Sequence, residues 1–230
     1  MTIRGILFDI DDTLIDYSSA ARFGVLEHLT AEGLLDRFAS PEAAVALWKR
    51  LEEYEYLRFL AGELTHSEQQ IVRTTAFLAE IGVTTDDPRA WFDRYVLHRD
   101  TAWVAFPDVP PLLRALTGRM AFGVVSNSSL AHQMSKLRAV DLHDHFGDAV
   151  LCSAEYGAPK PDPSIFLAGC ALLGLPPEQV AYVGDRYDTD GLGARDAGLR
   201  AFWLDRSALG IAHDEGVTVI HSLDALSTLD

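Results

Sequence analysis

The sequence predicts an α/β fold: a doubly wound parallel sheet interrupted by an inserted all-helical domain. Three observations indicate this. The apolar run Ile6–Phe8 leads directly into a group of acidic residues, as a buried parallel strand does where it ends at a site. Residues 17–106 carry helical periodicity only. Beyond Pro107, short apolar segments alternate with helical ones, which is typical of parallel strands joined by right-handed crossovers.

Residues 3–10 are expected to form the first strand, and the segment that follows is too long to be a loop. It comprises about 90 residues, whereas structureless loops in compact domains rarely exceed about 15. We therefore expect an α/β core domain built from residues 1–16 and 107–230, and a second, helical domain at 17–106.

Within 17–106, local signals mark where helices begin and end. Apolar residues recur at helical spacing from Ala44 to Ala61. Thr65 with Glu68, or Ser67 with Gln70, offers a capping box for the next helix. Gly82 is placed to end that helix, and Pro88 suits the first turn of another that carries Trp91, Phe92, Tyr95 and Val96.

After Pro107 the pattern of a parallel sheet resumes. Strands are expected at 122–125, 149–151, 180–183, 201–204 and 217–220. Helices are expected at 112–117, 130–140, 164–173 and 192–197. We find no internal repeat.

Composition limits the partners and the compartment. The net charge of -15 argues against nucleic acid or an anionic membrane surface as the main partner, although a small anion could bind where positive charge is local. No apolar stretch approaches the ~20 residues of a membrane span, and the first residues do not form a signal peptide. Cys152 and Cys170 fall on an expected strand and helix, which suits buried thiols. We expect a cytoplasmic protein.

The first strand runs into Asp9, Asp11 and Asp12, followed by Thr13. Carboxylates this close repel one another, so a fold normally keeps them together with a cation or a shared proton. The carboxyl ends of strands are also where open α/β sheets bind ligands. A plain acidic turn is the alternative explanation.

Three later segments place polar groups after strands. Ser126 and Asn127 stand at a strand-to-helix junction, a place suited to phosphate, although helix capping alone would explain them. Lys160 lies between two prolines, which restrict its backbone; a surface turn is the alternative. Asp185 and Asp190 belong to another acidic group at a strand end.

Together these segments resemble the four signature motifs of the haloacid dehalogenase superfamily, whose commonest members are phosphatases. The matches are Asp9-x-Asp11-x-Thr13, Ser126, Lys160 and Gly184-Asp185 with Asp190, in the family's order. The resemblance implies a Rossmann-like core with the helical cap of subfamily I. It also implies a phosphatase in which Asp9 is the nucleophile that forms an aspartyl-phosphate, and Asp11 is the general acid and then the base. Side chains at i and i+2 would share a face of an extended strand.

The resemblance further implies a Mg²⁺ site and a phosphate site. Mg²⁺ would bind the Asp9 side chain, the Asp11 backbone carbonyl and the Asp185 side chain. Thr13, Ser126, Asn127 and Lys160 would contact the phosphoryl group, and Asp190 would orient Lys160 or a metal-bound water. Asp12 and Asp188 match no required position.

Several alternatives stay open. Dehalogenases need no acid for a halide and lack an aspartate at the position of Asp11, which argues against that activity. A β-phosphoglucomutase-like mutase would share all four motifs. Phosphonate hydrolases of the family use a cap lysine, but Lys49 fits a solvated helix face. A phosphoacceptor receiver domain would carry its aspartate near mid-chain and leave the insertion unexplained.

The expected partner is a small phosphorylated metabolite: a sugar phosphate, phosphoglycolate or a nucleoside monophosphate. The nucleotide is included because aromatic residues are concentrated in 17–106, where one or two could stack on a base. The sequence is compatible with a monomer or a homodimer.

Overall fold

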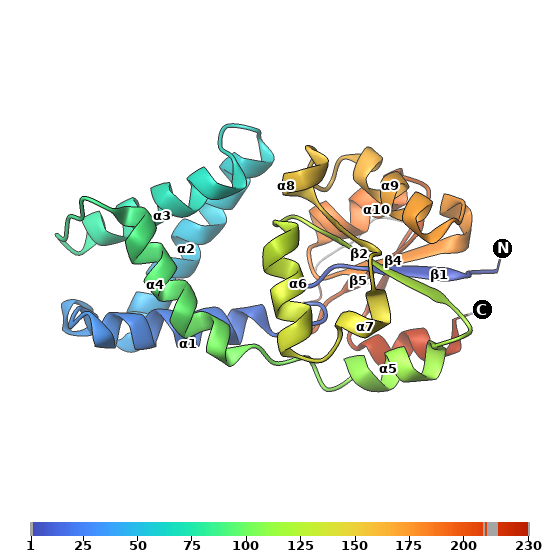
Figure 1. Ribbon diagram of the computed structural model, residues 1–230, viewed down its shortest axis with the longest axis horizontal. Helices are drawn as coiled ribbons and strands as arrows, with labels where there is room; N and C mark the ends of the chain where they lie inside the picture. The colour runs from blue at the N-terminus through green and yellow to red at the C-terminus, as the bar shows by residue number, and fades with distance from the viewer. Residues whose placement is uncertain (1, 209, 211–215, 230) are drawn as a thin grey trace. The chain divides into compact units, whose positions relative to one another are not determined.

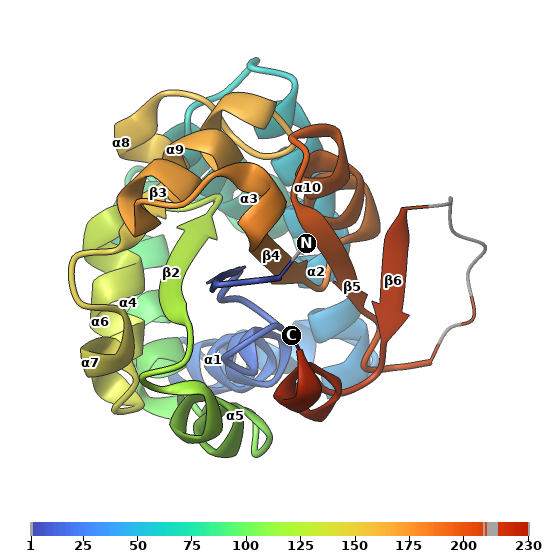
Figure 2. The same cartoon turned by 90° about the vertical axis from the view of Figure 1, so that its right-hand side faces the viewer.

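Six parallel strands form one sheet in the order β3-β2-β1-β4-β5-β6 (Figure 2). The computed structural model describes residues 2–208, 210 and 216–229. The strands are β1 (Gly5–Phe8), β2 (Ala121–Ser126), β3 (Val150–Cys152), β4 (Val180–Gly184), β5 (Arg200–Leu204) and β6 (Val217–Ile220). The expected α/β fold with a parallel sheet is confirmed.

The register of the sheet brings three strand ends together. Phe8, the last residue of β1, lies opposite Val124 of β2 on one side and Val183 of β4 on the other. Because the three strands are parallel and in step, the residues that follow them emerge at one edge of the sheet. This edge carries Asp9, Ser126 and Asp185.

Helices cover both faces of the sheet, as Figure 1 shows. On one face, α9 (Pro163–Leu173) and α10 (Gly193–Asp196) pack Phe166 and Ala194 into a core with Leu7 and Tyr182. On the other face, Phe8 contacts the ring of Phe146 from α7 (His143–Phe146). The remaining helices of this unit are α5 (Val109–Leu116), α6 (Leu130–Ala139) and α8 (Ser153–Tyr156).

Two local expectations require correction. The first strand ends at Phe8, not at residue 10, so Asp9 and Asp11 lie in the loop beyond it. Asp9 and Asp11 therefore do not share a face of an extended strand, contrary to the expectation. The helix expected at 192–197 begins earlier, as a π-helical turn at Tyr187–Leu192 that continues into α10.

The inserted segment forms a helical unit with its own core. It contains α1 (Tyr17–Ala31), α2 (Pro41–Leu60), α3 (His66–Glu80) and α4 (Pro88–Arg99). The Thr65–Glu68 capping box begins α3, and Asp87 caps α4. Trp48, Phe77, Trp91 and Tyr95 are buried together at the centre of the unit. Among the described residues, no helix combines the length and apolar content needed to cross a bilayer.

The two compact units are residues 1–16 with 104–230, and residues 17–103. Residues 104–106 join the core because they pair with the outgoing chain. The Asp16 amide donates to the Val104 carbonyl, and the Phe106 amide donates to that of Leu14. Both connections to the inserted unit are thereby held side by side within the core.

Candidate functional site

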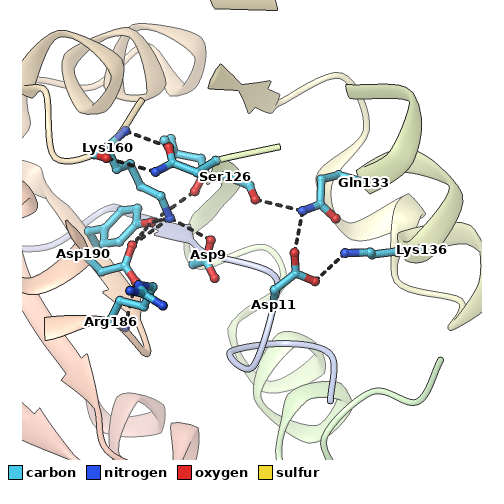
Figure 3. A network of polar contacts seen from close by, with 11 residues as sticks. Asp9, Asp11, Ser126, Gln133, Lys136, Lys160, Arg186 and Asp190 are labelled. Atoms are coloured by element: carbon cyan, nitrogen blue, oxygen red, sulfur yellow. Dashed lines mark hydrogen bonds and ion pairs between the residues drawn. The ribbon is translucent and has the colours of Figure 1, made fainter. Parts of the chain in front are cut away.

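Lys160 is the centre of a buried ionic cluster at the edge where β1, β2 and β4 end (Figure 3). Its ammonium lies 2.7 Å from Asp9 Oδ1, 2.7 Å from Asp190 Oδ1 and 2.8 Å from the Tyr182 hydroxyl. The side chains of Lys160, Asp9 and Asp190 are all nearly inaccessible to solvent. The site thus concentrates charge where water cannot screen it.

The loop that carries Lys160 is fixed by Asn127. The Asn127 amide oxygen accepts from the Lys160 backbone N–H at 2.7 Å, and its Nδ2 donates to the Lys160 carbonyl at 2.9 Å. Both ends of this amide are therefore engaged by the lysine's main chain. This pairing ties the end of β2 to the loop between α8 and α9.

Asp190 is held by groups from three directions. Its Oδ1 accepts from Lys160 and lies 3.0 Å from the Tyr182 hydroxyl, and its Oδ2 accepts from the Arg186 backbone N–H at 3.0 Å. Gly184 leaves room for it, because a Cβ there would lie 2.3 Å from the Asp190 Cγ. The π-helical turn and the glycine together place Asp190 within hydrogen-bond distance of the Lys160 ammonium.

Asp9, Asp185 and Asp190 each offer a carboxylate oxygen, and these oxygens lie within 4.8 Å of one another. Burial raises the pKa of Asp9 to about 7; Lys160 opposes the rise, and Asp190 and Asp11 add to it. Burial and the neighbouring Asp9 and Asp190 raise the pKa of Asp185 well above its ordinary value. Lys160 pairs with Asp9 and Asp190, and Asp185 adds a third carboxylate to the group, an arrangement that favours a further cation.

Asp11 turns away from this cluster toward α6 (Figure 3). Its Oδ1 accepts from Lys136 Nζ at 2.5 Å, and its Oδ2 accepts from Gln133 Nε2 at 3.0 Å. Burial acts to raise its pKa, but the charge and hydrogen bond of Lys136 and the hydrogen bond from Gln133 outweigh it, so the pKa is lowered. Asp11 is therefore a carboxylate at neutral pH in the substrate-free protein.

Two hydroxyl groups expected at the site are buried beside these residues. Ser126 Oγ, at the end of β2, accepts from Gln133 Nε2 at 2.9 Å. Thr13 is fully buried, and its Oγ1 has no hydrogen-bond partner among the residues that the structure describes. The Thr13 carbonyl accepts from Arg206 at 2.8 Å, which anchors the loop after β1.

The structure brings the expected residues to one edge of the sheet and adds three that the sequence analysis missed: Gln133, Lys136 and Tyr182. Tyr182 looks like an ordinary apolar position of β4 in sequence. A signal for Lys136 existed, because the chain has only three lysines and this one lies on the helix that follows Ser126. Gln133 is one turn earlier on the same helix.

The sequence matches a family model described as haloacid dehalogenase-like hydrolase over residues 3–198. Among curated proteins, the glyceraldehyde 3-phosphate phosphatase of Methanopyrus kandleri is 32% identical over 205 residues, which are 86% of this chain and 82% of that protein. The human N-acylneuraminate-9-phosphatase is 28% identical over 216 residues, 90% of this chain and 84% of its own.

Solved structures of two related proteins share the fold. The putative HAD-hydrolase YfnB of Bacillus subtilis, solved with magnesium bound, has a TM-score of 0.87 at 22% identity, covering 98% of this chain and 97% of its own. The 2-haloacid dehalogenase of Pseudomonas syringae has a TM-score of 0.67 at 26% identity, covering 99% and 98%.

Proposed function

The chain belongs to the haloacid dehalogenase-like hydrolase family, and on this premise we propose that it is a Mg²⁺-dependent phosphatase of small phosphomonoesters. One observation carries the proposal: the buried Asp9 carboxylate, 2.7 Å from the Lys160 ammonium, lies beside the carboxylates of Asp185 and Asp190 at one sheet edge. This edge offers a nucleophile, a cation for phosphate and oxygen ligands for a metal in one place.

The donor set fits a hard divalent cation. The Asp9 and Asp185 side chains, with the Asp11 backbone carbonyl, would hold Mg²⁺, which prefers oxygen ligands. Burial and the neighbouring carboxylates raise the pKa of both side chains, so a bound cation would favour their ionised forms. When bound, the metal would neutralise part of that charge and stabilise charge on the phosphoryl oxygens. Asp190 is less suited as a ligand, because both its oxygens already accept hydrogen bonds.

The reaction then needs two carboxylates with different tasks. An oxygen of Asp9 attacks phosphorus, the phosphorus–oxygen bond to the alcohol breaks, and an aspartyl-phosphate forms. Asp11 gives a proton to the leaving alkoxide and later takes one from the water that hydrolyses the acyl phosphate. A bound phosphate adds negative charge near Asp11, which raises its pKa and favours the protonated form that the first step requires.

The remaining site residues bind the phosphoryl group or position the residues that bind it. Lys160 and Ser126 contact phosphoryl oxygens, and Thr13, whose hydroxyl is unpartnered among the described residues, supplies another donor. Asp190 orients Lys160. Asn127 was expected to contact the phosphoryl group, but its bonds to the Lys160 main chain favour a role in holding that loop.

The substrate is proposed only as a class. The relatives named above act on different phosphorylated metabolites, so sugar phosphates, phosphoglycolate and nucleoside monophosphates all remain candidates. Residues 17–103 are proposed to act as the cap that selects among them. A cytoplasmic location is also part of the proposal, in keeping with Cys152 and Cys170, which are both buried and unpaired.

The test is hydrolysis of 4-nitrophenyl phosphate with Mg²⁺ or with EDTA, using wild type, Asp9→Asn and Asp188→Asn. Asp188 is exposed, so its variant controls for the loss of an acidic group. We expect turnover that needs the metal, falls more than about a thousandfold in Asp9→Asn, and is unchanged in Asp188→Asn. Metal-independent turnover, or an active Asp9→Asn, would disprove the proposal.

A parallel assay separates the other activities of the family. Chloride release from 2-chloropropionate would identify a dehalogenase, an activity that the acid group of Asp11 argues against. Isomerisation of a sugar phosphate without release of inorganic phosphate would identify a mutase.

A further inference from the structure

Helix α6 presents two buried polar side chains to the site that belong to none of the motifs recognised in the sequence. Gln133 is 0% and Lys136 is 1% exposed. Because they are three residues apart, they lie on the same helix face. They reach the two oxygens of one carboxylate: Lys136 binds Asp11 Oδ1, and Gln133 binds Asp11 Oδ2.

Burying a lysine for packing alone is energetically unfavourable. Removing an ammonium from water is unfavourable unless a charge partner and hydrogen bonds compensate, and an unbranched apolar side chain would fill the same space without that cost. Lys136 is nevertheless fully buried and pairs with Asp11, whose side chain is partly exposed. The Lys136 ammonium therefore contacts the Asp11 carboxylate from the buried side.

The orientation of the Gln133 amide follows from Asp11. An ionised carboxylate only accepts hydrogen bonds, so the nitrogen of Gln133 must face it. The same nitrogen lies 2.9 Å from Ser126 Oγ and donates to it. The Ser126 hydroxyl is then an acceptor toward Gln133, and its own hydrogen points elsewhere.

We propose that Gln133 and Lys136 are positioning residues for phosphoryl transfer. They hold Asp11 in the orientation from which it protonates the leaving oxygen, and Gln133 turns the Ser126 hydroxyl so that it donates to a phosphoryl oxygen. This inference rests on the proposed phosphatase activity. It adds a contribution from α6 to a site otherwise built by the loops after the strands.

The proposal predicts a dependence on the leaving group. Phenolate is a stronger base than 4-nitrophenolate, so its departure depends more on a proton from Asp11. The ratio kcat/KM reports the steps up to the first irreversible one and excludes hydrolysis of the aspartyl-phosphate. Misplacing Asp11 should therefore lower kcat/KM for phenyl phosphate more than for 4-nitrophenyl phosphate.

The experiment compares Lys136→Met, Lys136→Arg and Gln133→Leu with wild type on both esters. Lys49→Met is the control, because Lys49 is exposed on α2 in the other compact unit. We expect Lys136→Met and Gln133→Leu to lose about tenfold more kcat/KM with phenyl phosphate than with 4-nitrophenyl phosphate. Lys136→Arg should recover part of the loss, and Lys49→Met should match wild type.

The Ser126 half of the proposal has its own readout, inhibition by inorganic phosphate. Ser126→Ala and Gln133→Leu should each weaken this inhibition. In the double variant the loss of inhibition should be smaller than the product of the two single losses, because both changes act through the Ser126 hydroxyl. Independent effects that multiply would overturn this half.

Equal losses on the two esters, or no loss, would overturn the role of α6 in positioning Asp11. Circular dichroism and thermal unfolding show whether each variant folds. If Lys136→Met does not fold, Gln133→Leu decides, because it removes a neutral amide and leaves the ion pair intact. Failure of wild type to hydrolyse either ester would instead refute the proposed phosphatase activity, and this inference with it.

Discussion

Replacing Asp9 by asparagine should stabilise the metal-free protein at neutral pH while abolishing its activity. Burial, opposed by Lys160 and reinforced by Asp190 and Asp11, raises the pKa of Asp9 from 3.8 to about 7. The ionised carboxylate is therefore less stable in the folded protein than in the unfolded chain. Asparagine keeps an oxygen that accepts from Lys160 but carries no charge.

The sign and size follow from proton linkage. Between pH 3.8 and about 7 the folded state binds more protons at Asp9 than the unfolded chain does, so this group's contribution to stability falls as pH rises. A shift of about three pKa units corresponds to about 4 kcal/mol, complete near pH 7. At pH 5, which lies between the two pKa values, the cost is smaller, about 2 kcal/mol.

Urea unfolding of wild type and Asp9→Asn in EDTA at pH 5 and pH 7.5 measures this difference. Asp9→Asn should be the more stable protein at both values, with the larger margin at pH 7.5. Mg²⁺ at 100 times its Kd should stabilise wild type by about 2.7 kcal/mol and the variant by less. A margin that is unchanged with pH, or a less stable variant at pH 7.5, would refute the argument from burial.

Three further substitutions test the parts around Lys160. Gly184→Ala places a Cβ 2.3 Å from the Asp190 Cγ, so turnover of 4-nitrophenyl phosphate should fall about a hundredfold and urea unfolding should show a loss of about 1–3 kcal/mol; wild-type kinetics would contradict the steric argument. Tyr182→Phe leaves Lys160 and Asp190 without a shared hydroxyl and should cost about 1–3 kcal/mol of stability by urea unfolding, with kcat within about tenfold of wild type. Asn127→Ala releases the Lys160 main chain and should raise KM for 4-nitrophenyl phosphate about tenfold in steady-state assays; an unchanged KM would show that the loop holds itself.

The sheet was predictable because its strands are short, mostly apolar runs, and the central strands β1 and β4 are buried throughout. The expected strand at 217–220 matches β6, and those at 180–183 and 201–204 differ from β4 and β5 by one residue. The end of β1 was not predictable in this way, since Ile10 is apolar and fully buried although it lies in the loop. Apolarity reports burial, and a buried loop gives the same signal as a strand.

The candidate site was predictable where residues stand in recognisable order along the chain, as Asp9, Lys160 and Asp185 do. It was not predictable where a contact depends on the rotation of a helix. Whether Gln133 and Lys136 face the site or solvent is decided by how α6 packs, because polar residues on a helix are normally exposed. Tyr182 was missed because only its hydroxyl, at the end of a large apolar ring, is polar.

The paired connections at Asp16 and Val104 have a consequence for how this architecture can change. Within the helical unit, the rings of Tyr17 and Trp103 stack with centroids 6.1 Å apart, so the segment starts and finishes at nearly the same point. An inserted segment whose two ends lie close together can be replaced by another, because the replacement needs only to begin and end at the same two neighbouring points of the core. An antiparallel bridge between Ile15 and Ala105 joins the two connecting segments within the core unit. If the insert acts as the proposed cap, substrate selection can evolve by exchange of the insert while the sheet and its site stay unaltered.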